Sequence, residues 1–513
     1  MTPTNRDISA TQKYHAATSH SWQSVYHSPH HLDWGNQPRP FKIYPGLEGQ
    51  KLPTELSSSG LAALASLAAT SIAEHKVPTL RDLAGLLRYS AGITKTSDFQ
   101  GGRMYFRAAA CTGALYHIEL YVVCGNLPNL AAGVYHFGAQ DFALRLLREG
   151  DYRGVLIEAA GGEPAMAQAP AVIVATSVYW RNAWKYQARA YRHTYWDSGT
   201  ILSNLLAMGA AYNIPLKVIA SFSDGPVNRL LDLDDQREVA LQMVPVGRDP
   251  EGIISPPPEV GPLGLEVKPY SRSEADYPAM GEMHAASSLV SPQEVKELWG
   301  NPPAPDRTEP QGQLFALASP PASELPGDAI EDVISRRGSS RRFRRAPISY
   351  SQLSTMLDRA TRGIAADVLD GPAATLNQMY LIVNDVDGLP AGSYVFHPDR
   401  GALEQLQEGD FREQAGRLDL GQELAADASV NLYFLTGLKG VLERYGNRGY
   451  RMAQMEASIM GGRLYLGAYA HGLGATGLTF FDDEVTEFFS PHAQGKSVMF
   501  LVALGRPQRR RRG

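Results

Sequence analysis

The chain has 513 residues, a formal net charge of −5 and 44% hydrophobic residues. At roughly 150 residues per domain, this length predicts two or three domains. The slight negative charge gives no reason to expect a nucleic acid or an anionic membrane as a partner. The two cysteines, Cys111 and Cys124, argue against a disulfide scaffold and lack the paired spacing of zinc or iron–sulfur ligands.

The N-terminal residues contain no apolar core of a secretory signal, and no run reaches the ~18 apolar residues of a membrane span. We therefore expect a soluble, cytoplasmic protein. The basic run from Arg509 to Arg512 is interpreted as a solvated tail, because chain ends usually lie at the surface.

In the first half, four runs of apolar and β-branched residues predict strands, at residues 118–123, 171–176, 216–220 and 239–246. Continuous runs of this kind are typical of strands that are covered on both faces. Between the second and third runs, one helical stripe predicts a long helix packed in the core; it consists of Ile201, Leu205, Met208 and Tyr212.

Residues 249–327 are rich in proline, as in SPPPEVGP and NPPAPDRTEP, and predict a linker that runs extended over the surface. A short helix is expected at residues 291–299. At ~3 Å per residue, such a segment can join two domains in nearly any orientation.

The second half has its own set of predicted strands, at residues 380–383, 430–436, 478–481 and 497–504. Its long helix carries a stripe that we again interpret as core packing; the stripe consists of Met452, Met455, Ile459, Arg463 and Leu466.

The two halves repeat each other at a nearly constant spacing. Tyr380 follows Tyr121 by 259 residues, each within a predicted strand. After one deletion the spacing becomes 258, where Phe480-Phe481-Asp482 follows Phe222-Ser223-Asp224. The chain is therefore interpreted as a duplication, with mixed α/β (α+β) domains at residues 1–248 and 328–513.

The second half opens with an arginine-rich run that includes Arg337, Gly338, Ser339 and Arg341. Guanidinium groups bind phosphate oxygens bidentately, so the run predicts a phosphate site. A solvated surface and a nucleic-acid-binding patch are the alternatives. At the aligned place the first half holds SSSGLAALASLAAT, without an arginine, so only the second half is expected to bind phosphate.

Four segments resemble the nitroreductase family. The run from Arg337 to Phe343 resembles the R-x-S-x-[KR]-x-F signature that opens such domains. Residues 474–483 (GATGLTFFDD) resemble the loop under the flavin, and 502–507 (VALGRP) resemble the closing strand with its phosphate-side arginine. Residues 107–116 (RAAACTGALY) resemble a loop of the SagB-type dehydrogenase branch, and the tandem arrangement is similar to the long SagB/ThcOx-type members.

The resemblance implies two tandem nitroreductase-like domains that form an intramolecular pseudo-dimer around one FMN. The cofactor-binding residues that it implies in the second domain are Arg337, Gly338, Ser339, Arg341, Gly477, Leu478, Thr479, Phe480 and Arg506. The first domain would supply a partner loop of Ala110, Cys111, Thr112, Gly113 and Ala114. The reciprocal site lacks the arginines and has Asp370-Gly371-Pro372-Ala373-Ala374 as its loop, so one FMN per chain is expected.

SagB-type enzymes also carry a catalytic Lys-Tyr pair, which the repeat matches to Lys185-Tyr186 and to Arg444-Tyr445. We expect Arg444 and Tyr445 beside the surviving site as candidate catalytic residues, and Lys185-Tyr186 on the empty side. Arginine is not a base near neutral pH, which weakens the case for azoline chemistry. Tyr445 acting alone and a structural role for both tyrosines stay open.

The function expected from these residues is an FMN-dependent oxidoreductase that transfers hydride by a ping-pong mechanism, from transiently bound NAD(P)H to a small-molecule acceptor. One alternative is a SagB-type dehydrogenase that oxidises a peptide or azoline-like substrate. Another is a non-catalytic flavin-binding scaffold, in which the bulky Phe480 and Phe481 block the site. No metal is expected, because the histidine spacing fits no ligand set. The chain is expected to be a monomeric pseudo-dimer or a homodimer of it.

Overall fold

The computed structural model describes residues 4–69, 75–99, 102–252, 256, 258–303, 309–371 and 373–508. The basic run from Arg509 to Arg512 lies outside the described residues. So do Thr70, which ends the arginine-free stretch of the first half, and Pro372 in the loop of the second half.

The first half is built around one antiparallel sheet with helices on both faces. The sheet consists of β1 (Gln50–Lys51), β4 (Ile118–Cys124), β5 (Gly133–Gly138), β6 (Ala143–Glu149), β7 (Ala171–Val178) and β8 (Glu238–Val246). Strands β2 (Ile93–Phe99) and β3 (Gly102–Arg107) form a separate hairpin. The helices of the first half are α1 (Ser9–Thr18), α2 (Trp22–Tyr26), η1 (Trp34–Asn36), α3 (Ala63–Ser66), α4 (Leu80–Ala91), η2 (Thr112–Ala114), α5 (Arg153–Ala159), α6 (Pro164–Ala167), α7 (Tyr179–Tyr186), η3 (Gln187–Arg189), α8 (Ala190–Ala211) and α9 (Asp224–Leu230).

The second half repeats this plan. Its strands are β10 (Phe343–Arg344), β11 (Ile348–Ser349), β12 (Gln378–Val383), β13 (Val386–Asp387), β14 (Gly392–His397), β15 (Ala402–Glu408), β16 (Val430–Thr436), β17 (Gly474–Gly477) and β18 (Ser497–Pro507). Its helices are α12 (Ile330–Arg336), α13 (Tyr350–Ala360), α14 (Arg412–Leu418), α15 (Glu423–Asp427), α16 (Leu438–Tyr445), α17 (Arg448–Ala470) and α18 (Asp482–Phe488).

The order of the strands confirms the duplication. The first sheet runs β1-β6-β5-β4-β7-β8, and the second runs β10-β18-β16-β12-β14-β15-β9. The series β6-β5-β4-β7-β8 therefore matches β15-β14-β12-β16-β18, strand for strand. Helices α4 and α13 also begin alike, each with a capping box, made by Thr79 and Asp82 in one and by Ser349 and Gln352 in the other. The predicted α+β fold with two tandem domains is confirmed.

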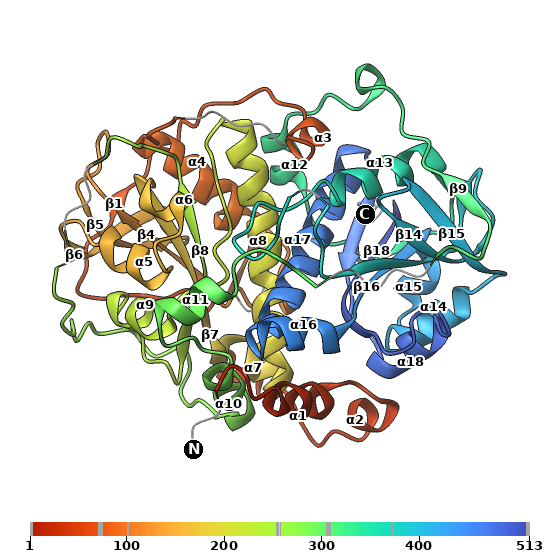
Figure 1. The fold of residues 1–513 in the computed structure, drawn as a ribbon, viewed down its shortest axis with the longest axis horizontal. Helices are drawn as coiled ribbons and strands as arrows, with labels where there is room; N and C mark the ends of the chain where they lie inside the picture. The colour runs from red at the N-terminus through yellow and green to blue at the C-terminus, as the bar shows by residue number, and fades with distance from the viewer. Residues whose placement is uncertain are drawn as a thin grey trace.

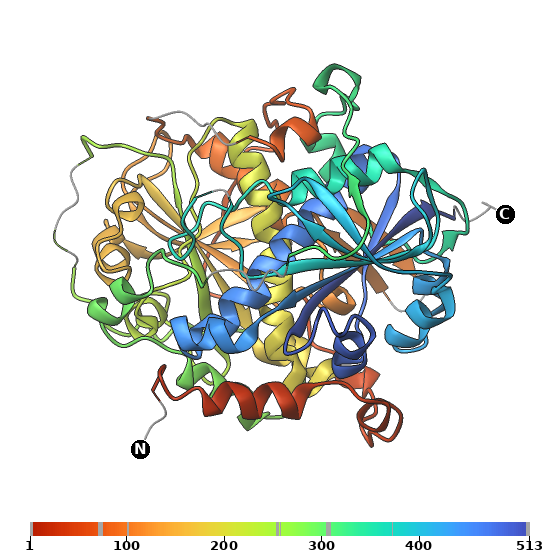
Figure 2. The same ribbon diagram turned by 45° about the vertical axis from the view of Figure 1, so that its right-hand side comes forward.

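The long helices α8 and α17 lie side by side between the two sheets (Figures 1 and 2). Both are buried around almost their whole circumference, because each packs on its own sheet and on the other helix. The backbones come close where Gly199 faces Ser458 and where Gly462 faces Ser203. The two domains thus share one continuous core.

Two buried ion-pair clusters, related by the repeat, join the halves. Asp224 of the first half accepts from Nη1 of Arg448 at 2.7 Å and from Nη1 of Arg451 at 2.8 Å. Asp482 of the second half accepts from Arg189 at 2.9 Å and from Arg192. The arginines hold the pKa of Asp224 at about 2 and that of Asp482 well below its usual range, against the opposing effect of burial.

The linker is more structured than an extended chain. It contains α10 (Pro278–Ala286), α11 (Pro292–Glu297), β9 (Leu314–Ala316) and η4 (Ala322–Glu324). The predicted short helix at 291–299 is confirmed as α11, and β9 adds an edge strand to the second sheet beside β15.

The N-terminal segment packs on both halves rather than on the first domain alone. Helices α1 and α2 run along one side of the molecule (Figure 1). The Asn5 side chain donates to the Tyr445 carbonyl at 3.0 Å, and the His20 N–H donates to Asp482 at 2.8 Å.

Two strand predictions were wrong. Residues 216–220 form only isolated bridges, at Leu216, Val218 and Ile219. The strand expected at 478–481 is β17, which lies earlier and ends at Gly477, because the chain then leaves the sheet to line a cavity. Within the described ranges, no helix is both long and apolar enough to cross a bilayer.

Candidate functional site

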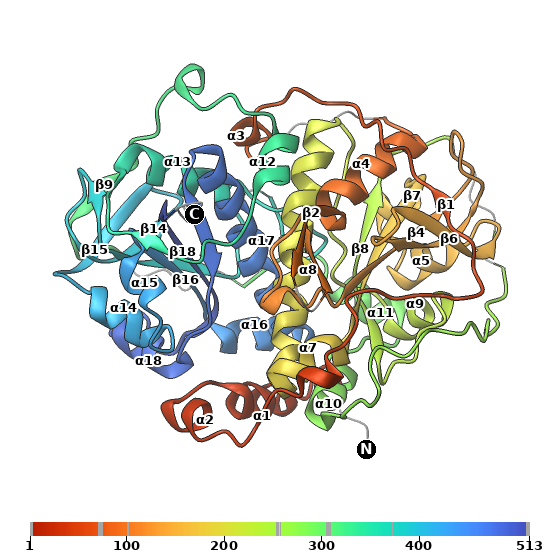
Figure 3. The ribbon, with the colours of Figure 1, turned by 180° about the vertical axis from the view of Figure 1, so that it is seen from behind.

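A cavity of about 1150 Å³ lies between the two halves. The first half contributes the hairpin β2–β3, the loop 109–114, the end of α7 and the N-terminal part of α8; the second contributes the arginine-rich run, the start of α15, Tyr465 and Tyr469 of α17, and residues 476–479. Strand β2 of the hairpin contacts α12 (Figure 3). Both domains are therefore needed to form the cavity.

Most of the residues expected at the cofactor site line this cavity. They are Arg337, Gly338, Ser339, Arg341, Gly477, Leu478 and Thr479 of the second half, with Ala110, Cys111, Thr112, Gly113 and Ala114 of the first. Their roles stay predictions, but their convergence is a property of the structure.

Two expected residues do not reach the cavity. Arg506 lies on β18, where its Nε donates to the Pro347 carbonyl at 2.7 Å. Phe480 is fully buried and packs against Trp196 and the Arg189 guanidinium. Neither Phe480 nor Phe481 lines the cavity, so the blocked site that the scaffold alternative requires is absent at these positions.

Arg337 connects the halves at the edge of the cavity. Its guanidinium donates to the carbonyls of Ala108, at 2.9 Å, and Arg107, at 2.8 Å, and it lies over the Tyr465 ring. Burial lowers the pKa of this guanidinium. Arg337 thus fixes the start of the partner loop while it presents positive charge to the cavity.

Among the described residues, Arg341 is one of three exposed cations that line the cavity, with Lys95 and Arg336. It makes no hydrogen bond or ion pair with any residue in the described part of the chain. Burial lowers the pKa of Lys185 on the opposite domain, and the charge of Arg341 adds to this effect. An exposed, uncompensated guanidinium at the mouth of a cavity can bind an anionic group.

Backbone donors face the same cavity beyond the end of β17. The Gly477 N–H donates to the Tyr465 hydroxyl. Among the described residues, the N–H groups of Leu478 and Thr479 have no hydrogen-bonding partner, and the Thr479 hydroxyl is buried without one. Such unpaired groups are rare unless a ligand or water completes them.

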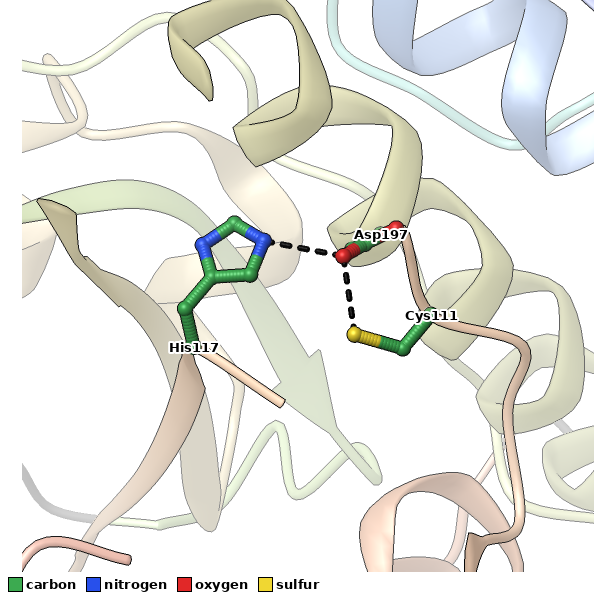
Figure 4. Close-up of side chains that lie close together, drawn as sticks. All are labelled: Cys111, His117 and Asp197. Atoms are coloured by element: carbon green, nitrogen blue, oxygen red, sulfur yellow. Dashed lines mark hydrogen bonds and ion pairs between the residues drawn. The ribbon is translucent and has the colours of Figure 1, made fainter. Parts of the chain in front are cut away.

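The loop 110–114 is held by Asp197 of α8. Its carboxylate accepts from the Thr112 N–H at 2.9 Å, the Thr112 hydroxyl at 2.8 Å and the Cys111 thiol at 2.9 Å. His117 Nε2 lies 2.9 Å from the same carboxylate (Figure 4). Gly113 has a positive φ of 60°, which favours glycine at this tight turn.

Cys111, His117 and Asp197 lie close enough to be considered as metal ligands, which their sequence spacing did not indicate. Burial and Asp197 raise the pKa of the Cys111 thiol well above its usual range, so the sulfur keeps its proton and donates to the carboxylate. A metal requires the thiolate. The cluster is therefore best described as the anchor of the loop.

The anchor also fixes the protonation of His193. The Thr112 hydroxyl donates to Asp197, so its oxygen accepts from Asn182 Nδ2 at 2.8 Å. Asn182 then directs Oδ1 at His193 Nδ1, 2.9 Å away, which must carry the proton. Burial and the neighbouring Arg189 hold the pKa of His193 well below its usual range. The neutral ring thus presents an unprotonated Nε2 to the cavity that it lines.

The expected placement of the two Lys-Tyr positions was wrong. Lys185 and Tyr186 line the cavity, whereas Arg444 and Tyr445 do not. The reason is local: α7 ends against the loop of its own domain, where the Tyr186 hydroxyl lies next to Gly113. The Lys-Tyr pair that lines the cavity therefore belongs to the same domain as the loop 110–114, and not to the domain with the arginine-rich run.

Arg444 and Tyr445 instead hold the linker. The Arg444 guanidinium donates to the carbonyls of Glu297, Trp299, Gly300 and Asn301, and the Tyr445 hydroxyl donates to the Val368 carbonyl at 2.7 Å. Burial raises the pKa of Tyr445. These contacts are structural and leave no group of the pair facing the cavity.

The sequence reasoning missed Asp197, Asn182 and His193. A signal was present: Asp197 lies four residues before Ile201, on the helical stripe that was predicted to pack in the core, and a carboxylate in such a position is rarely buried without a specific partner.

Comparison with known proteins explains this arrangement. The sequence model of the family described as "Nitroreductase family" matches residues 80–248 and 334–506, more than half of the chain. The chain belongs to the nitroreductase family. Both copies of the repeat match, so the family assignment extends to each domain.

One solved structure matches nearly the whole chain, whereas other relatives match about a third of it. A crystal structure of a protein from Anabaena variabilis, provisionally named a nitroreductase, is 27% identical; the match covers 97% of this chain and 99% of that one, with a TM-score of 0.78. A provisionally named nitroreductase of Methanocaldococcus jannaschii is 28% identical over 34% of this chain and 90% of its own length. A solved nitroreductase-family protein from Desulfovibrio desulfuricans, described in complex with FMN, is 14% identical, with coverage of 36% and 92% and a TM-score of 0.26.

Proposed function

We propose that this nitroreductase-family chain is an FMN-dependent oxidoreductase that holds one FMN in the cavity between its domains. It would take hydride from NAD(P)H and pass it to a small-molecule acceptor. The observation that supports this most is the convergence of Arg337, Ser339 and Arg341 with the loop 110–114 around one cavity of about 1150 Å³.

The residues present fit an FMN. The unpaired Arg341 and the Ser339 hydroxyl suit a phosphate, and Arg337 adds positive charge beside them. The unpartnered N–H groups of Leu478 and Thr479 suit the polar edge of the isoalloxazine ring. The volume of about 1150 Å³ exceeds the usual range of small-molecule pockets and leaves room for a second molecule.

When bound, FMN would supply the two-electron chemistry that no side chain of this protein provides. The residues of the chain would do the rest. The N–H groups near residues 478 and 479 would stabilise negative charge, as preorganised donors do. The wall formed by Tyr186, His193 and Trp196 would exclude water from the opposite face. His193 Nε2 would accept a hydrogen bond from a substrate group in that space.

The visible spectrum of the purified protein, with released flavin counted per chain, tests the proposal. About one FMN per chain is expected, and anaerobic addition of NADH or NADPH should bleach the flavin. A colourless protein that also fails to bind added FMN would contradict it. Two FMN per chain would contradict the single site.

A second candidate is a SagB-type dehydrogenase, and the position of Lys185 and Tyr186 favours it. Burial and Arg341 lower the pKa of Lys185, which increases the fraction of neutral amine at a given pH. A peptide or azoline-like substrate would lose a hydride from carbon to the bound FMN and a proton to this amine, and dioxygen would take the two electrons from the flavin. Only the first candidate predicts rapid bleaching by NAD(P)H; the second predicts a flavin indifferent to nicotinamide and a Lys185→Met variant without dehydrogenase activity.

We also propose that the active form is the single chain, because α8 and α17 already form the contact that two subunits would make. Light scattering coupled to size exclusion should give the mass of one chain with full flavin content. A larger assembly whose dissociation releases the flavin would contradict this.

A further inference from the structure

The second domain contains another cavity, of about 400 Å³, which shares no lining residue with the first. It lies where β12 begins and β14 and β16 end, under α13 and α17. Its apolar wall consists of Ile364, Leu376, Met379, Phe396, Leu435 and Met460. The volume falls within the range of small-molecule sites.

A buried guanidinium points into this cavity. Arg463 of α17 is 8% exposed, and its only hydrogen bond among the described residues runs from Nη1 to the Ala360 carbonyl at 3.2 Å. No carboxylate forms an ion pair with it in the described part of the chain. Burial lowers its pKa to about 10, so it still carries its charge at neutral pH. A buried, unpaired charge is costly unless a partner completes it.

The other charged groups of the cavity are Asp358, Arg362, Asp399, Glu456 and Lys496. Asp358 pairs with Arg362 at 3.0 Å. Glu456 accepts from the Leu376 N–H at 2.9 Å and from Asn377 Nδ2 at 2.7 Å, which anchors the loop before β12. Asp399 and Lys496 each have further contacts. The Glu456 carboxylate attracts the Arg463 guanidinium without forming an ion pair with it, so among the described residues Arg463 is a cation of this cavity that no carboxylate contacts directly.

The repeat shows that this charge is not a requirement of the fold. The residue 259 positions before Arg463 is Asn204, whose amide donates to the carbonyls of Tyr89 at 2.9 Å and Ala108 at 3.1 Å. The space beside Asp197, the counterpart of Glu456, is only about 10 Å³, and Arg107 lines it. The first domain thus has a neutral, hydrogen-bonded amide at this position and almost no open space, whereas the second keeps a cavity around a cation.

We propose that this second cavity binds a small organic carboxylate. The carboxylate would pair with the Arg463 guanidinium, which matches its geometry bidentately, and the apolar body of the ligand would lie against Met379, Phe396 and Met460. The site is independent of the flavin cavity and of the proposed oxidoreductase activity.

The test is calorimetric titration and thermal unfolding of the full chain with butyrate, hexanoate, octanoate and benzoate, each compared with the amide of the same body. At least one carboxylate should bind, at least tenfold more tightly than its amide. Arg463→Met should abolish the difference, and Arg463→Lys should restore part of it. Arg362→Met, at the exposed mouth, is the matched control and should leave binding unchanged.

Binding should persist in an Arg341→Ala variant with reduced flavin, which separates this site from the larger cavity. If Arg463→Met does not fold, Arg463→Gln takes its place. The proposal is overturned if none of these acids stabilises the wild-type chain more than the Arg463 variants, or if carboxylate and amide bind equally.

Discussion

The two related sites of the duplicated chain differ less in volume than in how their backbone donors are used. In the larger cavity, the N–H groups of Leu478 and Thr479 are unpaired within the described residues. At the reciprocal place, the matching N–H groups of Ala220 and Ser221 both donate to the Asp367 carboxylate at 2.9 Å. A cavity of about 640 Å³ remains nearby. A duplicated site can therefore lose its ligand-binding groups by pairing them internally, without being filled.

The region around Ala220 and Ser221, which the repeat matches to Leu478 and Thr479, is also held by contacts with chain segments that have no equivalent among the described residues at the larger cavity. Residues 364–368 stand where the first half has the β2–β3 hairpin, and they pair with Val218. The linker adds its own contact, from the Gly300 N–H to the Asp367 carbonyl at 2.8 Å. The remaining cations are engaged: Lys217 pairs with Glu163 at 2.7 Å, and Arg248 donates to Gln168 at 2.5 Å. In the larger cavity, Arg341 is free of such a partner among the described residues.

The largest effect is expected at the ion-pair clusters, which should behave alike in the two halves. Asp482→Asn and Asp224→Asn should each lower the free energy of unfolding by about 3–5 kcal/mol, because each leaves two buried guanidinium groups without their carboxylate. Denaturant titration measures this, with the exposed Asp483→Asn as control. A loss in either variant no larger than that of the control would show that the cluster does not join the domains.

The next prediction compares the loss of stability caused by substitutions at the two related sites, Asp367 at one and Thr479 at the other. Asp367→Ala should lower the free energy of unfolding by about 3 kcal/mol, because two buried N–H groups lose their acceptor. Thr479→Ala should lower it by about 0.5 kcal/mol or less, because the Thr479 hydroxyl has no hydrogen-bonding partner among the described residues. Chemical denaturation of the flavin-free protein gives both values. Equal losses in the two variants would contradict the comparison of the sites.

Acid should weaken the junction between the domains. The neighbouring arginines depress the pKa of Asp224 to about 2, whereas an aspartate in an unfolded chain has a pKa of ~4. The ionised carboxylate therefore adds about 2 kcal/mol to the free energy of unfolding at pH values above ~4. This contribution is lost as the pH falls towards about 2. Unfolding free energies between pH 6 and pH 3 should fall more steeply for the wild type than for Asp224→Asn. Parallel curves would refute the assignment.

The smallest of these effects concerns the proposed flavin. Arg341→Ala should weaken FMN binding about tenfold or more through loss of a charge-assisted contact, without changing stability. Arg342→Ala, next to it but outside the cavity, and Arg444→Ala, at the reciprocal place, should leave flavin content unchanged. Fluorescence titration of the flavin-free protein measures this. Loss of flavin in Arg444→Ala instead would place the cofactor at the other site.

Local patterns allowed much of the fold to be predicted. The strand runs around Tyr121 and Tyr380 and the two long helices follow from apolar periodicity, and the constant spacing identified two domains. The end of β17 was misplaced because Leu478 and Phe480 are apolar for different reasons: Leu478 lines a cavity and Phe480 packs in the core. Hydrophobicity alone does not distinguish these environments.

The candidate site was predicted where a single segment carries it and missed where several segments cooperate. The arginine-rich run and the loop 110–114 were found because each is a continuous motif. The relay from Asp197 through Asn182 to His193 was not, because its members come from the middle of α8, the middle of α7 and the start of α8. Only a folded chain shows that their donors and acceptors face one another.

The sequence by itself determined that this protein is a duplicated α+β chain with the arginine-rich run of residues 336–342 in the second half only, because repeats and local periodicity are properties of the linear order. The tertiary structure decided which site stays open and which Lys-Tyr position faces it. Lys185 and Tyr186 lie by the cavity because α7 packs on the loop of its own domain, while Arg444 and Tyr445 are committed to the linker. Those outcomes depend on hydrogen bonds between segments far apart in the chain, which short-range patterns do not encode.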